Sequence, residues 1–155
     1  MAEPTPKELF DLGMLSYDKQ DFSKARKYFE KACDLNNGGG CGALGFLYGT
    51  GKGVEKNLIK AAYFYAKACD LNNGGGCGNL GVLYQKGEGV EKDLTKAAYL
   101  YSKACELKES FGCGALAALY INGQGVEKNL TKADQYISKA CKLGDQEACE
   151  ALKEK

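Results

Sequence analysis

The feature that most constrains the fold is a pair of cysteines, eight residues apart, that recurs along the chain. All eight cysteines belong to such pairs, and each pair follows the last by 36 residues: Cys33/Cys41, Cys69/Cys77, Cys105/Cys113 and Cys141/Cys149. A fixed period of this length is typical of a solenoid of helix pairs, in which each unit buries its apolar face against its neighbours. We therefore predict an all-α fold, an α-solenoid of helix-turn-helix repeats.

Each unit contains two turns of different kinds. The cysteines of a pair bracket a short segment, such as Asp34 to Gly40, which we expect to be the loop between one helix and the next. A longer turn, Gly49 to Lys56, carries glycines that can adopt the positive φ that ends a helix. Asn57, Asp93 and Asn129 follow these longer turns, where the second helix of each unit needs an N-cap.

The spacing predicts one repeat domain over residues 1–155, with units of about 7–40, 41–76, 77–112 and 113–148 and a capping helix at about 145–153. The first helix is expected to begin near Pro6. Gly45 lies in the middle of a helix, where glycine costs about 1 kcal/mol relative to alanine. We expect it to allow the partner helix to bring Ala62 almost onto the backbone, as Gly81 would allow for Ala98.

Regular, even cysteine pairs favour a disulfide framework and an oxidising compartment. Reduced buried cysteines and a metal site are the alternatives. The metal alternative is weak because the chain has no Cys-x2-4-Cys spacing and no histidine. No cofactor and no metal are expected, and we predict a secreted or periplasmic protein. No signal peptide precedes Ala2, which we interpret as a mature or recombinant form with an added Met1.

Charge and hydropathy argue against two classes of partner. The formal net charge of +1 provides no concentrated basic surface for nucleic acid. No apolar run approaches the roughly 18 residues that a membrane-spanning helix requires. We therefore expect neither nucleic-acid binding nor a membrane span.

The repeat pattern resembles known families. The first unit is similar to a tetratricopeptide unit at Leu12, Gly13, Asp21, Ala25, Phe29 and Ala32. The later units resemble its longer-turned relative, the Sel-like repeat, in Leu44-Gly45-x-Leu-Tyr48, Gly51-x-Gly53-Val54 and Lys60-Ala-Ala. With Cys-x7-Cys across every junction, the chain resembles the Helicobacter cysteine-rich protein family over residues 7 to 152.

This resemblance implies a right-handed superhelix whose first helices line the concave side, with a disulfide across each Cys-x7-Cys. It also implies two functions: the cysteine-rich family has been described as penicillin-binding with weak β-lactamase activity, and related Sel-like repeat proteins are adaptors for other proteins. Partners would then be a protein or peptide, or a β-lactam or related cell-wall compound.

Candidate binding residues are the non-core positions of the first helices. They are Met14, Phe46, Asn79, Val82, Gln85, Lys86, Ala118 and Asn122, with Ala43 and Ala115 beside them. Asn79 is the most suggestive, because a side-chain amide can pair with both the N–H and the C=O of an extended peptide.

A catalytic alternative depends on Ser16 and Lys19, which have the Ser-x-x-Lys spacing of serine β-lactamases. The signal is weak, because no Ser-Asp-Asn or Lys-Thr-Gly partner appears. Ser16 also falls where later units carry tyrosines in a packing position. We therefore interpret Ser16 as structural.

The leading hypothesis is a protein or peptide interaction scaffold that binds on the concave face. The second is a penicillin-binding protein with weak β-lactamase activity. The third is a designed or reconstructed repeat protein without a natural ligand, because the units beginning at Cys33 and Cys69 share 27 of 36 positions.

Overall fold

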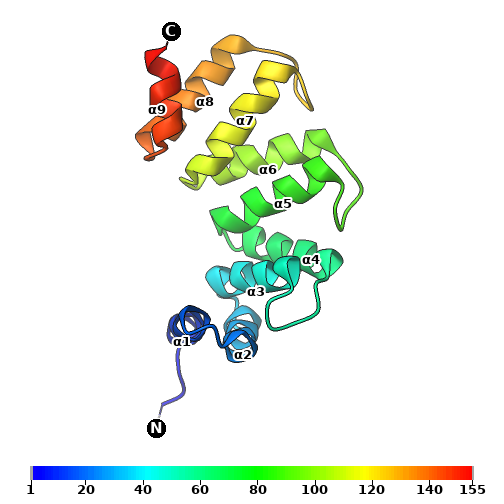
Figure 1. Cartoon of the computed structure of the whole chain (residues 1–155), viewed down its shortest axis with the longest axis vertical. Helices are drawn as coiled ribbons and strands as arrows, with labels where there is room; N and C mark the ends of the chain where they lie inside the picture. The colour runs from blue at the N-terminus through cyan, green and yellow to red at the C-terminus, as the bar shows by residue number, and fades with distance from the viewer. Residues whose placement is uncertain (1, 155) are drawn as a thin grey trace. The chain divides into compact units, whose positions relative to one another are not determined.

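The computed structural model describes residues 2–154, and all regular secondary structure within them is helical (Figure 1). The helices are α1 (Pro6–Asp18), α2 (Phe22–Asp34), α3 (Gly38–Thr50), α4 (Leu58–Asp70), α5 (Gly74–Lys86), α6 (Leu94–Glu106), α7 (Ser110–Asn122), α8 (Leu130–Lys142) and α9 (Gln146–Lys153). The predicted all-α fold of helix-turn-helix repeats is confirmed.

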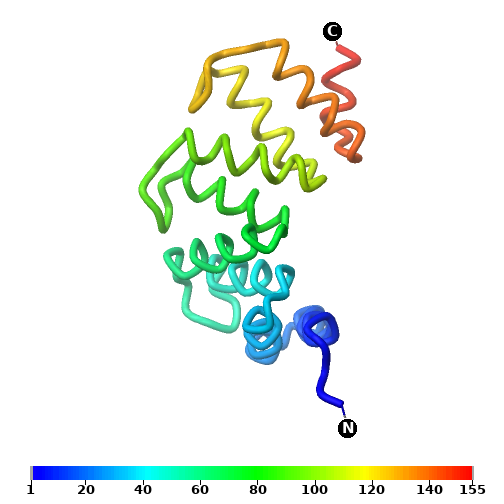
Figure 2. The backbone as a smooth tube through the Cα atoms, turned by 180° about the vertical axis from the view of Figure 1, so that it is seen from behind, coloured from blue at the N-terminus to red at the C-terminus, as the bar shows by residue number. Residues whose placement is uncertain are grey.

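The contacts divide the chain into two compact units, one up to Gly76 and one from Cys77 onward. In the first unit, α1 packs with α2 and α3 with α4 as helical hairpins, and α2 also packs against α3. In the second unit, α6 packs against α7, α7 against α8, and α8 against α9. Figure 2 shows the tight turn between α1 and α2 and the longer turns that follow α3, α5 and α7. The repeat boundaries given above remain a prediction.

The predicted N-caps of the second helices are confirmed. The side-chain oxygens of Asn57, Asp93 and Asn129 each accept a hydrogen bond from the backbone N–H three residues on, at 3.0, 3.0 and 2.9 Å. These bonds satisfy donors that have no partner within the helix. Helix α1 begins at Pro6 as expected, with Thr5 as its N-cap.

The short segment between paired cysteines differs from its prediction. Helix α3 begins at Gly38, so Gly38 to Gly40 form its first turn and are not part of a loop. The reason is a cap that the sequence reading overlooked: Asn37 Oδ1 accepts from the N–H of Gly40 at 2.7 Å. Asn73 does the same for Gly76 at 2.8 Å. The turn between α2 and α3 therefore needs only Leu35 to Asn37.

The mid-helix glycines have a different partner from the one predicted. A Cβ on Gly45 would lie 2.8 Å from the ring of Tyr65, so an aromatic side chain, and not Ala62, occupies the space above this glycine. Gly81 faces Tyr101 in the same way, also at 2.8 Å. A flat aromatic ring can lie directly on a backbone that has no side chain. An alanine methyl group would fill the space above the glycine less well.

The junction disulfides are present. Cys33–Cys41, Cys105–Cys113 and Cys141–Cys149 have Cα–Cα distances of 4.5, 4.7 and 4.7 Å, and Cys69 and Cys77 are also disulfide-bonded. No cysteine in the described residues is a free thiol, which removes the reduced-cysteine alternative. Each of the bridges Cys33–Cys41, Cys105–Cys113 and Cys141–Cys149 ties the end of a second helix to the start of the helix that follows it.

We expect the two buried tyrosines to make the fold sensitive to alkali. Burial raises the pKa of Tyr65 and of Tyr101 to about 12, above the ordinary value of 10. Below pH 10 these phenols are neutral in both the folded and the unfolded chain, so they make their full contribution to the free energy of unfolding. Between pH 10 and 12 the unfolded chain ionises first, and stability falls.

The measurement is the urea midpoint at pH 9 and at pH 11.5 for the wild type and for Tyr65→Phe. The variant should lose less stability between the two pH values, because its ring cannot ionise. Tyr63→Phe is the matched control, since Tyr63 is 65% exposed and its substitution removes no buried phenol. Equal losses in wild type and Tyr65→Phe would contradict the expectation.

Candidate functional site

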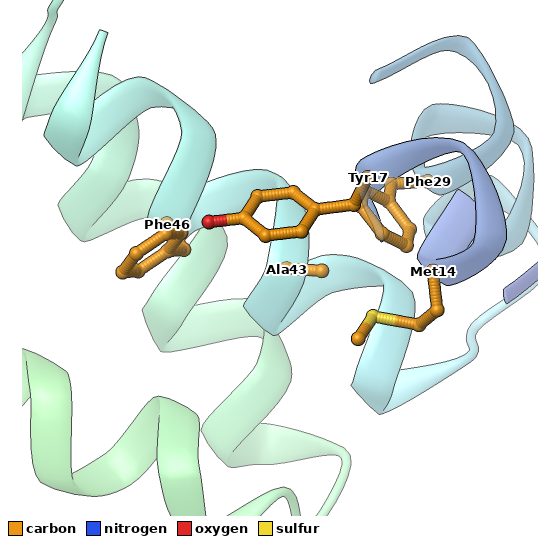
Figure 3. Close-up of a pocket in the computed structure, with 5 residues that line it drawn as sticks. All are labelled: Met14, Tyr17, Phe29, Ala43 and Phe46. Atoms are coloured by element: carbon orange, nitrogen blue, oxygen red, sulfur yellow. The ribbon is translucent and has the colours of Figure 1, made fainter. Parts of the chain in front are cut away.

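An open apolar pocket lies among α1, α2 and α3 (Figure 3). Its volume is about 270 Å³, and it is lined by Met14, Tyr17, Phe29, Ala43 and Phe46. Phe29 belongs to the core and is 1% exposed, whereas Met14 and Phe46 are 39% and 40% exposed. We refer to this site as the Tyr17 pocket.

Tyr17 joins the pocket to a cationic side chain from the longer turn. Its ring centroid lies 5.2 Å from that of Phe22 and 6.3 Å from that of Phe46. Lys52 Nζ lies 5.2, 5.3 and 5.7 Å from the ring centroids of Tyr17, Phe22 and Phe46, and it donates a hydrogen bond to Tyr17 Oη at 3.0 Å. The negative faces of the rings attract the ammonium group and hold it at this position.

The structure brings together the candidates that the sequence placed in the first unit. Met14 and Phe46 lie on different helices, and both line the pocket together with Ala43. The sequence reading did not include Tyr17, Phe29 or Lys52 in this site. Phe29 was noted for its similarity to a tetratricopeptide unit, and Lys52 lies in a turn. No spacing rule links a turn lysine to an aromatic residue 35 positions earlier.

The candidates of the second unit lie in more varied surroundings. Asn79, Lys86, Ala118 and Asn122 are exposed. Val82 is half-buried and packs against the core of this unit. Gln85 has a structural contact, because its Oε1 accepts a hydrogen bond from the hydroxyl of Tyr101 at 2.6 Å.

Three polar hollows accompany the longer turns, and their linings repeat. The hollow in the first unit includes Tyr48, Val54, Glu55, Lys56 and Lys60, with a volume of about 450 Å³. Two hollows in the second unit have corresponding linings and volumes of about 400 and 430 Å³. In each, a lysine lies 5.2 to 5.5 Å from the centroid of the tyrosine ring. The same contacts recur at each turn, so we assign them to the architecture of the repeat.

The hydroxyl of Ser16, the candidate nucleophile of the Ser-x-x-Lys pair, is engaged within its own helix. Ser16 is 6% exposed, and its hydroxyl donates to the carbonyl of Leu12 at 2.9 Å, a bond within its own helix. Lys19 is exposed and its backbone N–H closes the end of α1. These contacts support the structural interpretation of Ser16.

Two further properties concern the described residues 2–154. They contain no group of three or more His, Cys, Asp or Glu side chains arranged to hold a metal ion. Their helices all fall short of the length and apolar character needed to cross a bilayer.

These features define a disulfide-stapled protein of helical-hairpin repeats. The model of the Sel1 repeat matches residues 40–73, 76–109 and 110–145, and that of the tetratricopeptide repeat matches residues 6–38. The chain belongs to the Sel1 repeat family, and the similarities below relate it to the Helicobacter cysteine-rich proteins.

Among solved structures, Helicobacter pylori cysteine rich protein B is 42% identical with a TM-score of 0.70, over 84% of this chain and 94% of that one. A Sel1 repeat protein from Oxalobacter formigenes is 30% identical with a TM-score of 0.84, over 88% of this chain and 56% of that one. Beta-lactamase HcpA of Helicobacter pylori is 57% identical over 60 residues. That match covers 39% of this chain and only 24% of HcpA.

Proposed function

We propose that this protein is an interaction scaffold that binds a protein or peptide on the exposed side of its first helices. The observation that carries the proposal is the Tyr17 pocket, where Met14 and Phe46 lie exposed beside a tyrosine. Single apolar side chains are exposed elsewhere, such as Ile59 at 72%, but this pocket gathers five apolar and aromatic side chains around one hollow. Apolar hollows with a few polar groups are the usual form of a binding site.

The second unit supports the proposal through further exposed side chains on its first helices. Asn79 lies exposed on α5, where its amide can pair with the backbone of an extended peptide. Lys86, Ala118 and Asn122 are exposed on first helices as well. A repeat scaffold uses such positions for recognition, because substitutions there leave the packing between helices unchanged.

The disulfides support a secreted or periplasmic location. Structural disulfides persist in oxidising compartments and are rare in the cytosol. The names of relatives such as HcpA raise β-lactam hydrolysis as a second function. The buried Ser16 hydroxyl, bonded within its own helix, does not favour it, and we therefore place binding first.

The test is a selection from a random peptide library on the disulfide-intact protein, followed by dissociation constants for the enriched peptides. Phe46→Glu combined with Asn79→Lys should weaken binding at least tenfold, since a central contact in an interface is worth about 2 kcal/mol. Because Phe46 also contacts the ring of Tyr17, the melting temperature of the variant is measured beside that of the wild type, so that lost binding is separated from lost packing.

The matched control changes exposed side chains of second helices. Tyr63 and Tyr99 are 65% and 67% exposed on α4 and α6, and Tyr63→Glu combined with Tyr99→Glu should leave binding within twofold. If the control variant abolishes binding and the Phe46/Asn79 variant does not, the proposed face is wrong.

A further inference from the structure

The surroundings of the Tyr17 pocket depart from the repeat. Phe46 has Val82 as its counterpart 36 residues later, and Lys52 has Glu88. By contrast, the cysteines, the turn glycines and the N-caps recur from unit to unit. Architecture therefore requires neither the aromatic side chain nor the cation at these two positions.

The pocket itself fits a bulky apolar side chain. Its walls are a thioether, a methyl group and three aromatic rings, and the polar atom beside them is the hydroxyl of Tyr17. Phe46 and Met14 each keep more than a third of their surface exposed. A partner side chain that enters the pocket would remove this apolar surface from water.

The positive charge beside the pocket indicates the chemistry of the partner residue that would lie next to this apolar side chain. Lys52 Nζ donates to Tyr17 Oη at 3.0 Å, which leaves two of its three N–H groups for other acceptors. Within residues 2–154 no carboxylate lies within ion-pair distance of Lys52, although Lys7 and Arg26 each have such a partner. The surrounding rings partly shield the ammonium from water, which strengthens its attraction for an anion.

The two features share side chains. Tyr17 and Phe46 line the pocket, and the same two rings lie within 5.7 Å of Lys52 Nζ. An apolar group in the pocket and an anion at the lysine would therefore be close neighbours in one partner segment.

We infer that the Tyr17 pocket recognises a peptide segment in which a bulky apolar side chain stands next to an aspartate or glutamate, with Lys52 binding the carboxylate. This inference rests on the proposed function and specifies the chemistry of the partner.

The experiment uses two fluorescein-labelled probes, Gly-Ser-Phe-Asp-Ser-Gly and its Phe-Asn analogue, titrated with the full disulfide-intact chain. The aspartate probe should bind about fivefold more tightly at low salt, the upper range for a single exposed ion pair. Raising the salt to 0.5 M should reduce this preference, because exposed charges are screened.

Two lysine variants test the assignment. Lys52→Met keeps the apolar stem without the charge, so both probes should bind with equal affinity. Lys60→Met is the control, because Lys60 also lies over a tyrosine ring, 5.3 Å from the centroid of Tyr48, but outside the pocket. This variant should retain the fivefold preference.

Equal binding of the two probes to the wild type, or a preference that persists in Lys52→Met, would overturn the inference, as would failure of both probes to bind. The proposed function is judged separately by the library peptides. If those peptides depend on Phe46 and Asn79 but show no pairing of acidic and apolar residues, the scaffold function stands and the assignment to Lys52 is wrong.

Discussion

Reduction of the disulfides should leave this protein unfolded or only marginally stable at room temperature, the largest single effect that we expect. Closing a loop of about nine residues removes roughly 2.5 kcal/mol of unfolded-chain entropy in the loop model. All eight cysteines are bonded, so full reduction would remove about 10 kcal/mol. A whole domain is stable by about 5 to 15 kcal/mol, which leaves a marginal fold or none. The measurement is circular dichroism in urea, before and after reduction.

The bridges should not be reduced together. Cys33 and Cys41 are 1% and 0% exposed, whereas Cys141 and Cys149 are both partly exposed. A reducing thiolate must reach the sulfur, so Cys141–Cys149 should open first under graded dithiothreitol. Alkylation and mass spectrometry identify the order. A reduced chain that keeps its urea midpoint, or a first opening at Cys33–Cys41, would contradict the account.

A methyl group at Gly53 should destabilise the fold by about 3 kcal/mol, the sum of a conformational cost and an overpacking cost. Its φ is +71°, a conformation that costs an L-residue about 1 to 2 kcal/mol. The new Cβ would also lie 2.6 Å from the backbone carbon and oxygen of Phe22, which belong to the preceding hairpin. Backbone atoms at this distance have to move, so we expect the longer turn to detach from α2. The urea midpoint of Gly53→Ala measures the effect.

Gly51→Ala separates the two causes. Gly51 has nearly the same φ, +73°, but its nearest neighbour would be the Cβ of Lys56 at 3.2 Å. This variant should lose only about 1 to 2 kcal/mol, the penalty of the left-handed conformation. If the two variants are equally destabilised, contact with Phe22 does not determine the requirement for glycine.

Local features of the fold could be predicted from the sequence because local chemistry determines them. A cap needs a short polar side chain at the start of a helix, and Asn57 was recognised by its place after the longer turn. The first turn of the helix that begins at Gly38 was assigned to the loop, because its three glycines drew attention away from the same capping signal at Asn37. The cysteine period predicted the repeat, and the family resemblance supplied the pairing.

Contacts between helices were harder to predict. The sequence indicated that Gly45 allows close approach, but the choice of Tyr65 over Ala62 depends on how two helices rotate about each other. Ala117 occupies the corresponding position two units later than Gly45, and Ile137 corresponds to Tyr65. Ile137, which is smaller than tyrosine, thus accompanies the methyl group of Ala117. This compensation can be recognised only when the contact between Gly45 and Tyr65 is known.

The sequence predicted only part of the candidate site, because the rest depends on contacts between segments far apart in the chain. Met14 and Phe46 follow from the exposed side of their helices, so helical spacing was enough to find them. The position of Lys52 depends on how the longer turn folds back onto Tyr17 and Phe22, which no periodicity encodes. The cation beside the pocket therefore required the structure.

The most direct test of the scaffold function is hydrogen–deuterium exchange of the disulfide-intact protein with and without a library-selected peptide. We predict slower exchange in α1 and α3, around Met14 and Phe46, with α4 unchanged around Tyr63. Protection confined to the second helices, with α1 and α3 unaffected, would contradict the proposal that the first helices form the binding face.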